Sequence, residues 1–211
     1  MFFKQTNYPE DSLRKYGFDN NDRLNAFRYT DYCFEKFIEA AKKEKYFANT
    51  IFVFVGDHGI PGNSDAMYPK SFNELSLTSN HVPLLFYAPQ LLQPQPVHHV
   101  CSQLDIMPSI ATLLKQPFRN TGMGQSLFAD SASYRQAAFI IDHGPPTIGM
   151  VNNEYYYMKN TRTNKVDFVS ITNNNPVPEN KITDSIKNYL GILTDAYYAT
   201  SKYLLYNNKK K

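Results

Sequence analysis

The segment TIFVFVGDHGI, residues 50–60, constrains the fold of this chain more than any other. Its first seven residues are apolar, β-branched or aromatic, and no charged residue alternates with them. Such an uninterrupted run is typical of a strand that is covered on both faces in a mostly parallel sheet. Immediately after it come Asp57, His58 and Gly59, so a buried strand is predicted to end in groups that can carry chemistry.

The segment before this strand predicts a helix. Across residues 22–46, apolar residues recur every three or four positions with Lys and Glu between them, as expected of a surface helix with one buried stripe. The stripe consists of Leu24, Phe27, Phe34, Phe37, Ile38 and Ala41. A helix followed by a buried strand is half of an α/β unit, so the predicted fold class is α/β with helices flanking the sheet.

Composition excludes several classes of protein. The net charge of +3 is small and its visible excess lies in the terminal NNKKK, so a nucleic-acid partner is not expected. Cys33 and Cys101 match no metal-binding spacing, and their pairing stays open. No apolar run approaches the roughly 20 residues of a membrane span, and the first residues lack the apolar region of a signal peptide. We therefore expect a soluble chain with no membrane segment and no targeting signal.

Further elements are predicted downstream. Residues 82–88 and 137–141 resemble strands, and Asp105 is placed to cap a short helix that follows it. A polar turn at 161–164 lies between two strand-like segments and predicts an antiparallel hairpin. Residues 185–206 predict a C-terminal helix that docks on the body through a single apolar face. The predicted face consists of Ile186, Tyr189, Leu190, Leu193, Tyr197 and Leu204.

The end of the first strand is a candidate metal site. Gly59 gives the backbone the freedom to turn, so that Asp57 and His58 can converge although neighbouring side chains of a strand point to opposite faces. A carboxylate oxygen and an imidazole nitrogen suit Zn or Mn, and Mg less well because it prefers oxygen ligands. The alternative for the bare triplet is a turn-capping aspartate followed by a surface histidine.

The same triplet recurs at Asp142, His143 and Gly144, again after a strand-like run. It lacks the VPL segment that follows the first triplet, so we interpret it as a coincidence. The alternative is that its strand brings it to the rim of the same cleft.

Four ordered blocks give the chain a family resemblance. They are RYTDYCFEKFIEAAKKEKYFANTIFVFVGDHG, HVPLLFYAP, QLDIMPSIATLL and GMGQSLF, and the match runs from about Asn25 to Phe128. This succession resembles the C-terminal half of sulfatase-like enzymes of the alkaline phosphatase superfamily, and within it the lipoteichoic acid synthase and phosphoglycerol transferase branch. The resemblance implies that Asp57 and His58 bind a catalytic divalent metal (Mn, Zn or Mg). It also implies that His81 lies near the anionic substrate or a second metal, whereas the residues alone fit a loop histidine bonded to backbone.

The resemblance also implies a domain organisation. Residues 1–211 are expected to be the C-terminal part of a sulfatase-like catalytic domain, in a partial alkaline-phosphatase-like sandwich with a C-terminal antiparallel hairpin and helix. Residues 22–130 would form the motif-bearing α/β core, 131–182 the further strands and hairpin, and 183–211 a helix with a basic tail.

The family's nucleophile is expected upstream of this chain. No strand followed by an exposed Thr or Ser precedes Asp57, and the C/S-x-P-x-R pattern of sulfatases is absent. We therefore expect no catalytic nucleophile here, a missing N-terminal half of the catalytic domain as partner, and no turnover by the chain alone. The parent enzyme is expected to be membrane-anchored with an extracytoplasmic catalytic domain.

The activity expected from the resemblance is metal-dependent transfer of a phosphoglycerol-type group, with an anionic lipid-linked or ester substrate. One alternative is hydrolysis of sulfuric or phosphoric esters by an enzyme of the same superfamily. The other is a non-catalytic remnant that serves as an interaction module.

Overall fold

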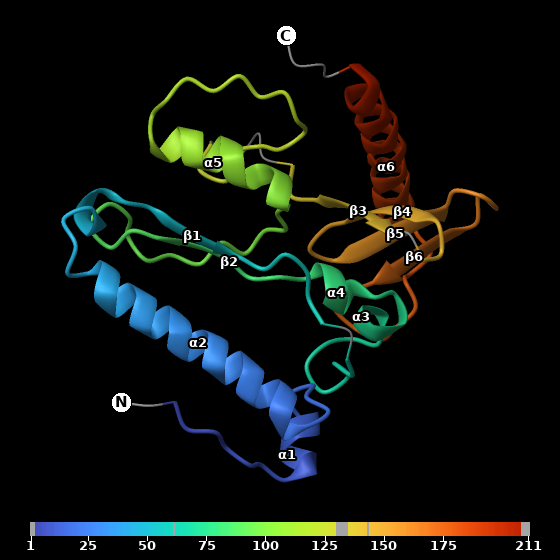
Figure 1. Cartoon of the computed structure of the whole chain (residues 1–211). Coiled ribbons are helices and arrows are strands. Elements are labelled where there is room, and N and C mark those ends of the chain that lie inside the picture. Colours follow the sequence, from blue (N-terminus) through green and yellow to red (C-terminus); the bar gives the residue numbers. More distant parts are fainter. Residues whose placement is uncertain (1–2, 61, 130–134, 143, 208–211) are drawn as a thin grey trace. The chain divides into compact units, whose positions relative to one another are not determined.

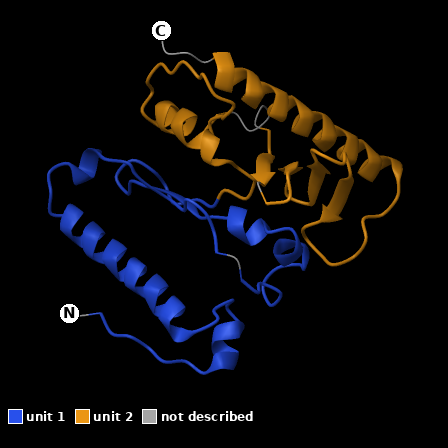
Figure 2. Ribbon diagram, turned by 45° about the vertical axis from the view of Figure 1, so that its right-hand side comes forward, with its two compact units in different colours: residues 1–96 blue, residues 97–211 orange. Residues whose placement is uncertain are grey.

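The computed structural model describes residues 3–60, 62–129, 135–142 and 144–207. The chain forms two compact units, Met1–Pro96 and Val97–Lys211 (Figure 2). The boundary between them falls inside the segment 22–130 that was expected to form one core. Each unit has its own sheet and its own long helix (Figure 1).

The first unit is built around one long helix and a two-stranded sheet. Its elements are α1 (Glu10–Arg14), α2 (Asn21–Ala41), η1 (Phe47–Asn49), β1 (Phe52–Val55), α3 (Ser71–Glu74), α4 (Leu77–Asn80) and β2 (Leu84–Tyr87). Asn20 begins α2 as its N-cap, and its side chain accepts a hydrogen bond from the backbone N–H of Arg23. Both strands lie where the apolar runs predicted them.

The direction of these strands differs from the prediction. β1 and β2 pair antiparallel, with Val55 opposite Leu84, so the expected mostly parallel sheet is wrong. An apolar run reports burial and carries no information on strand direction. A parallel pair needs a crossover, usually one long helix, whereas the described residues between these strands form two helices of four residues each. The two faces are also not fully covered, because Val55 is 43% exposed and Leu85 52%.

Helix α2 packs on β1 through aromatic rings. Phe34 meets Phe54 edge-on with ring centroids 5.1 Å apart, and Phe37 meets Phe52 in the same way at 5.8 Å. The predicted stripe therefore faces the sheet, but these two phenylalanines remain about half exposed. The helix ends at Ala41, five residues earlier than the periodicity predicted.

The second unit is an antiparallel sheet with a long helix beside it. Its elements are η2 (Gln103–Asp105), α5 (Ile106–Leu113), β3 (Ala138–Asp142), β4 (Thr147–Val151), β5 (Tyr155–Asn160), β6 (Val166–Ser170) and α6 (Lys181–Asn207). The strand order is β3-β4-β5-β6, and all neighbours are antiparallel. The predicted hairpin is confirmed as β5–β6. β4 forms a further hairpin with β5, whereas the sequence predicted one continuous strand there.

The core of this unit lies between α6 and the sheet, which lie side by side (Figure 1). Met150 on β4 and Leu190 on α6 are fully buried there, and Tyr157 on β5 joins them. The predicted C-terminal helix is thus confirmed, but Tyr189 was wrongly assigned to its buried face. Each helical residue turns the side chain by about 100°, so Tyr189 points away from Leu190 and is 54% exposed.

Candidate functional site

Asp57 and His58 lie in the turn that follows β1, as the sequence predicted. Both side chains are open to solvent, 88% exposed for Asp57 and 76% for His58. Two glycines allow the turn to approach its neighbours closely. A Cβ at Gly56 would stand 2.9 Å from the Cβ of Val82, and one at Gly59 would overlap the carbonyl oxygen of Thr78.

The two side chains converge on each other. The Oδ1 of Asp57 accepts a hydrogen bond from the backbone N–H of His58 (2.8 Å), and its Oδ2 lies 3.7 Å from His58 Nε2. This backbone hydrogen bond, helped by the positive charge available on the His58 ring, lowers the pKa of the Asp57 carboxyl. Asp57 therefore keeps its negative charge to lower pH than an ordinary aspartate.

The tautomer of His58 follows from its own hydrogen bond. Nδ1 lies 2.9 Å from the carbonyl oxygen of Gly59, and a carbonyl can only accept, so Nδ1 carries the proton. In the neutral ring Nε2 then presents its lone pair. This is the usual arrangement of a metal-binding histidine, whose other nitrogen donates to a backbone carbonyl or a carboxylate.

The turn also brings His81 into the same region. Gly59 donates its N–H to the carbonyl of Ser79 (2.8 Å), and the backbone oxygen of His81 lies 3.4 Å from where a Gly59 Cβ would stand. The His81 ring is exposed and makes edge contacts with Tyr68 and Phe72, at centroid distances of 5.7 and 5.9 Å. The backbone N–H of His81 donates to the carbonyl oxygen of Leu77, the first residue of α4 (2.8 Å). The backbone of His81 thus lies beside the turn that carries Asp57 and His58.

The donor set fits a divalent cation in part. Asp57 Oδ2 and His58 Nε2 are 3.7 Å apart, less than twice the usual ligand distance of about 2.0–2.2 Å, so one ion can reach both. Within the described ranges no three His, Cys, Asp or Glu side chains cluster closely enough to bind a metal. These two ligands therefore need others to complete a tight site.

The second triplet has a different role. Asp142 is the last residue of β3, and its Oδ1 accepts a hydrogen bond from the backbone N–H of Gly144 (2.9 Å). This contact caps the turn between β3 and β4. His143 lies outside the described residues. The triplet belongs to the second unit, and a turn-capping aspartate agrees with the interpretation that its sequence is a coincidence.

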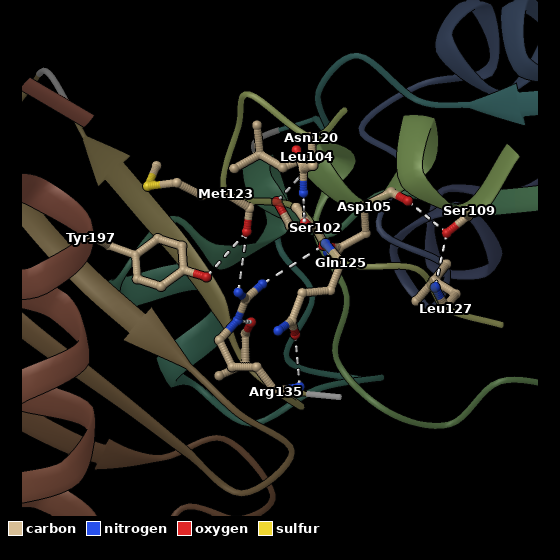
Figure 3. Close-up of polar contacts among 12 residues, drawn as sticks. Ser102, Leu104, Asp105, Ser109, Asn120, Met123, Gln125, Leu127, Arg135 and Tyr197 are labelled. Atoms are coloured by element: carbon tan, nitrogen blue, oxygen red, sulfur yellow. Dashed lines mark hydrogen bonds and ion pairs between the residues drawn. The ribbon is translucent and has the colours of Figure 1, made fainter. Parts of the chain in front are cut away.

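Asp105 has a larger structural role than the predicted helix cap. Its Oδ2 accepts from the N–H of Ser102 within a capping box of η2, and its Oδ1 accepts from the N–H of Gln125 (2.7 Å). Arg135 Nη2 lies 3.7 Å from the same Oδ1, and both side chains are buried (Figure 3). Asp105 precedes α5 but makes no side-chain cap to it. The spacing SQLD was the available sequence signal for the capping box.

The GMGQSLF block, residues 122–128, is held against η2 and α5 by Asp105 and Ser109 (Figure 3). Ser109 Oγ donates to the carbonyl of Asp105 (2.6 Å) and accepts from the N–H of Leu127 (2.9 Å). Arg135 also lies over the ring of Tyr197 on α6, 4.8 Å from its centroid. One buried aspartate, Asp105, therefore links η2, residues 122–128 and Arg135. The spacing of residues in the sequence does not predict this role, because it depends on residues far along the chain.

Comparison with known proteins decides the family. The family model described as Sulfatase matches residues 3–116, more than half of the chain. The chain belongs to the sulfatase family. The matched segment contains Asp57, His58 and His81, whereas Asp142 lies outside it.

Two curated relatives are arylsulfatases. The chain is 33% identical to arylsulfatase K of Gallus gallus over 112 residues, which cover 50% of this chain and 20% of the relative. It is 28% identical to arylsulfatase K of Canis lupus familiaris over 129 residues, covering 58% and 23%. The match thus spans less than a quarter of either relative. These relatives give no support to the expected resemblance to the lipoteichoic acid synthase branch.

Among the helices of the residues that the structure describes, α2 and α6 included, none combines the length and the hydropathy that crossing a bilayer requires.

Proposed function

We propose that this chain forms part of the active site of a sulfuric ester hydrolase, in which Asp57 and His58 bind the divalent cation. Membership of the sulfatase family and the arylsulfatase relatives support this activity over phosphoglycerol transfer, the activity first expected. The observation that carries the proposal is the convergence of Asp57 Oδ2 and His58 Nε2 at 3.7 Å, with Nδ1 bonded to a carbonyl.

The chain's own residues would prepare this site. The Gly59 carbonyl holds His58 in the tautomer that offers Nε2, and the His58 backbone N–H keeps Asp57 ionised. When bound, a divalent cation supplies a Lewis acid that can activate a nucleophile and neutralise charge on an ester oxygen. One carboxylate and one imidazole favour Zn or Mn over Mg. The remaining ligands and the nucleophile are assigned to a part of the catalytic domain outside these residues.

His81 is proposed to contact the sulfate group of the substrate. Its exposed ring makes edge contacts with Tyr68 and Phe72, so a ring N–H can be presented to an anion without losing much side-chain freedom. Its backbone adjoins Gly59, which follows the proposed ligands. His81→Ala should therefore raise KM for a sulfate ester more than it lowers kcat.

The test is hydrolysis of an aryl sulfate and the matching aryl phosphate by the complete sulfatase domain that contains this chain. We expect the sulfate ester to be the better substrate. Asp57→Ala or His58→Ala should lower kcat/KM at least about 100-fold, because each removes a group that stabilises the transition state. Asp142→Ala is the matched control and should keep most of the activity. Preference for the phosphate would contradict sulfate chemistry, and activity unaffected by Asp57→Ala would contradict the ligand assignment.

Two further expectations stay predictions. One is that the parent enzyme is membrane-anchored with an extracytoplasmic catalytic domain. The other is that the 211-residue chain does not turn over alone, because it supplies only two ligands of the proposed site.

A further inference from the structure

Helix α6 has two apolar faces. The first packs on the sheet of the second unit, where Leu190 is fully buried and Ile186, Leu193 and Tyr197 pack around the same core. Residues of this face contact Met150 and Tyr157 of the sheet. This face accounts for the attachment of α6 to its own unit and leaves other apolar residues of the helix unexplained.

The second face follows a heptad pattern. Two series with a period of seven, three residues apart, run along the whole helix, as the a and d positions of a coiled coil do. We call this set the α6 seam: Ile182, Ser185, Tyr189, Ile192, Ala196, Ala199, Tyr203 and Tyr206. All eight side chains are exposed, with 74% for Ile182, 69% for Ile192 and 71% for Tyr206. None of these positions carries a charge, which is unusual for the solvent face of a helix.

The seam has the geometry that another helix recognises. Apolar residues spaced at about 3.5 per turn stay on one side of a helix only if that side packs against a helical partner. α6 has 27 residues, about 40 Å of helix, and the seam spans almost all of it. A sheet or an irregular loop would not require this spacing. This spacing favours a helical partner of comparable length.

We propose that the α6 seam binds the α6 seam of a second copy of this chain in an antiparallel pair. With the two-fold axis at Thr194, residues whose numbers are equally far from 194 lie opposite each other, and each a position meets a d position. The opposed pairs are Ile192 with Ala196, Tyr189 with Ala199, Ser185 with Tyr203, and Ile182 with Tyr206. Three of these four pairs place a large side chain against a small one, which lets the helices interdigitate. A parallel pair would instead place each tyrosine against itself.

Charge and area agree with this pairing. Asp195 beside the middle of the seam is neutralised within its own chain by Lys159, whose Nζ lies 2.7 Å from Oδ1, so its approach to the partner's Asp195 carries little repulsion. An aromatic side chain buries about 150–250 Å², and the three tyrosines of the seam are 54%, 65% and 71% exposed, so they offer roughly 300–500 Å² per copy before the two isoleucines are added. One partner contributes about 800 Å² to a protein interface of standard size, so the seam suits a reversible dimer at the small end of that range.

Sedimentation equilibrium of the 211-residue chain tests the proposal. Between roughly 1 and 100 µM we expect a reversible monomer–dimer equilibrium. Ile192→Glu, which places a charge in the middle of the seam, should weaken the dimer at least about 30-fold. Leu205→Glu is the matched control, because Leu205 lies on α6, is 80% exposed and is outside the seam. Circular dichroism of both variants establishes that the fold is kept. A monomer at every concentration, or a dimer that survives Ile192→Glu, overturns the proposal.

Cysteine cross-linking tests the direction of the pair. In a Cys33→Ser background, chains carrying Ile182→Cys are mixed with chains carrying Tyr206→Cys and oxidised. The antiparallel pair predicts a cross-link between the two kinds of chain, because 182 lies opposite 206. It predicts none between two Ile182→Cys chains, whose cysteines would be about 36 Å apart along the helix. Cross-linking of Ile182→Cys to itself would contradict the antiparallel arrangement.

Discussion

The backbone N–H of Gly59 donates a hydrogen bond to the carbonyl oxygen of Ser79, 2.8 Å away. This contact joins the turn that carries Asp57 and His58 to helix α4, whose last residue precedes His81. Two segments that are separated by some twenty residues of sequence are thereby fixed as one patch. The proposed metal ligands and the proposed substrate residue depend on this contact for their relative positions.

Gly59→Ala should disrupt the patch. An added Cβ would overlap the carbonyl oxygen of Thr78, and a backbone atom cannot move aside as a flexible side chain can. We expect a loss of about 1–3 kcal/mol or more in the unfolding free energy of the first unit, the usual cost of overpacking. Urea denaturation followed by NMR signals of that unit measures it.

The control for this change is Gly122→Ala, where the nearest atom lies 3.6 Å from the added Cβ and no clash arises. It should alter stability by no more than about 0.5 kcal/mol. Equal effects of the two substitutions would show that the close approach at Gly59 does not matter.

Asp105→Ala should destabilise the second unit strongly. The substitution leaves the Arg135 guanidinium, 9% exposed, without its buried counter-charge, and it removes the acceptor of two backbone N–H groups. Breaking a buried pair from one side costs about 3–5 kcal/mol. Asp167→Ala removes the exposed pair with Lys165 and should cost less than about 1 kcal/mol. Thermal and urea unfolding of both variants compare the two costs, and similar values would contradict the assigned role of Asp105.

Tyr156 should make the second unit sensitive to alkali. Burial raises the pKa of its hydroxyl, and the negative charge of Asp142 raises it further. Because the folded pKa is the higher one, the stabilisation is complete below the unfolded value of about 10 and is lost as the pH rises above it. Tyr156→Phe should flatten the fall in unfolding free energy above about pH 10. Tyr16→Phe, at an exposed ring, should leave that fall unchanged; an unchanged slope in Tyr156→Phe would refute the prediction.

Much of the local structure could be predicted from the sequence. The apolar runs located β1 and β2, turn chemistry located the β5–β6 hairpin, and helical periodicity located α2 and α6. These signals are local, since a strand or helix is marked by its own residues. The positions of Asp57 and His58 after a strand end followed from the same local pattern.

The predictions that were wrong concern contacts between residues far apart in the sequence, which a local pattern does not reveal. The antiparallel pairing of β1 with β2 follows from the path of the chain between them, and both directions bury similar apolar residues. The sequence predicted Asp105 only as a helix cap, because a cap is recognised from adjacent residues. Its partners Arg135 and Gln125 come from far along the chain. Tyr189 was expected in the core because the sequence predicted a single apolar face for α6. The helix has two apolar faces, and Tyr189 lies on the exposed one.

The most direct test of the central claim is a titration of the isotope-labelled chain with Mn²⁺, followed by NMR line broadening. Binding by Asp57 and His58 predicts that the signals of His58 and Gly59 broaden first, and that Asp57→Asn removes this effect while Asp142→Asn preserves it. Broadening centred elsewhere in the chain, or broadening at His58 that persists in Asp57→Asn, would contradict the assignment of these two residues as the metal ligands.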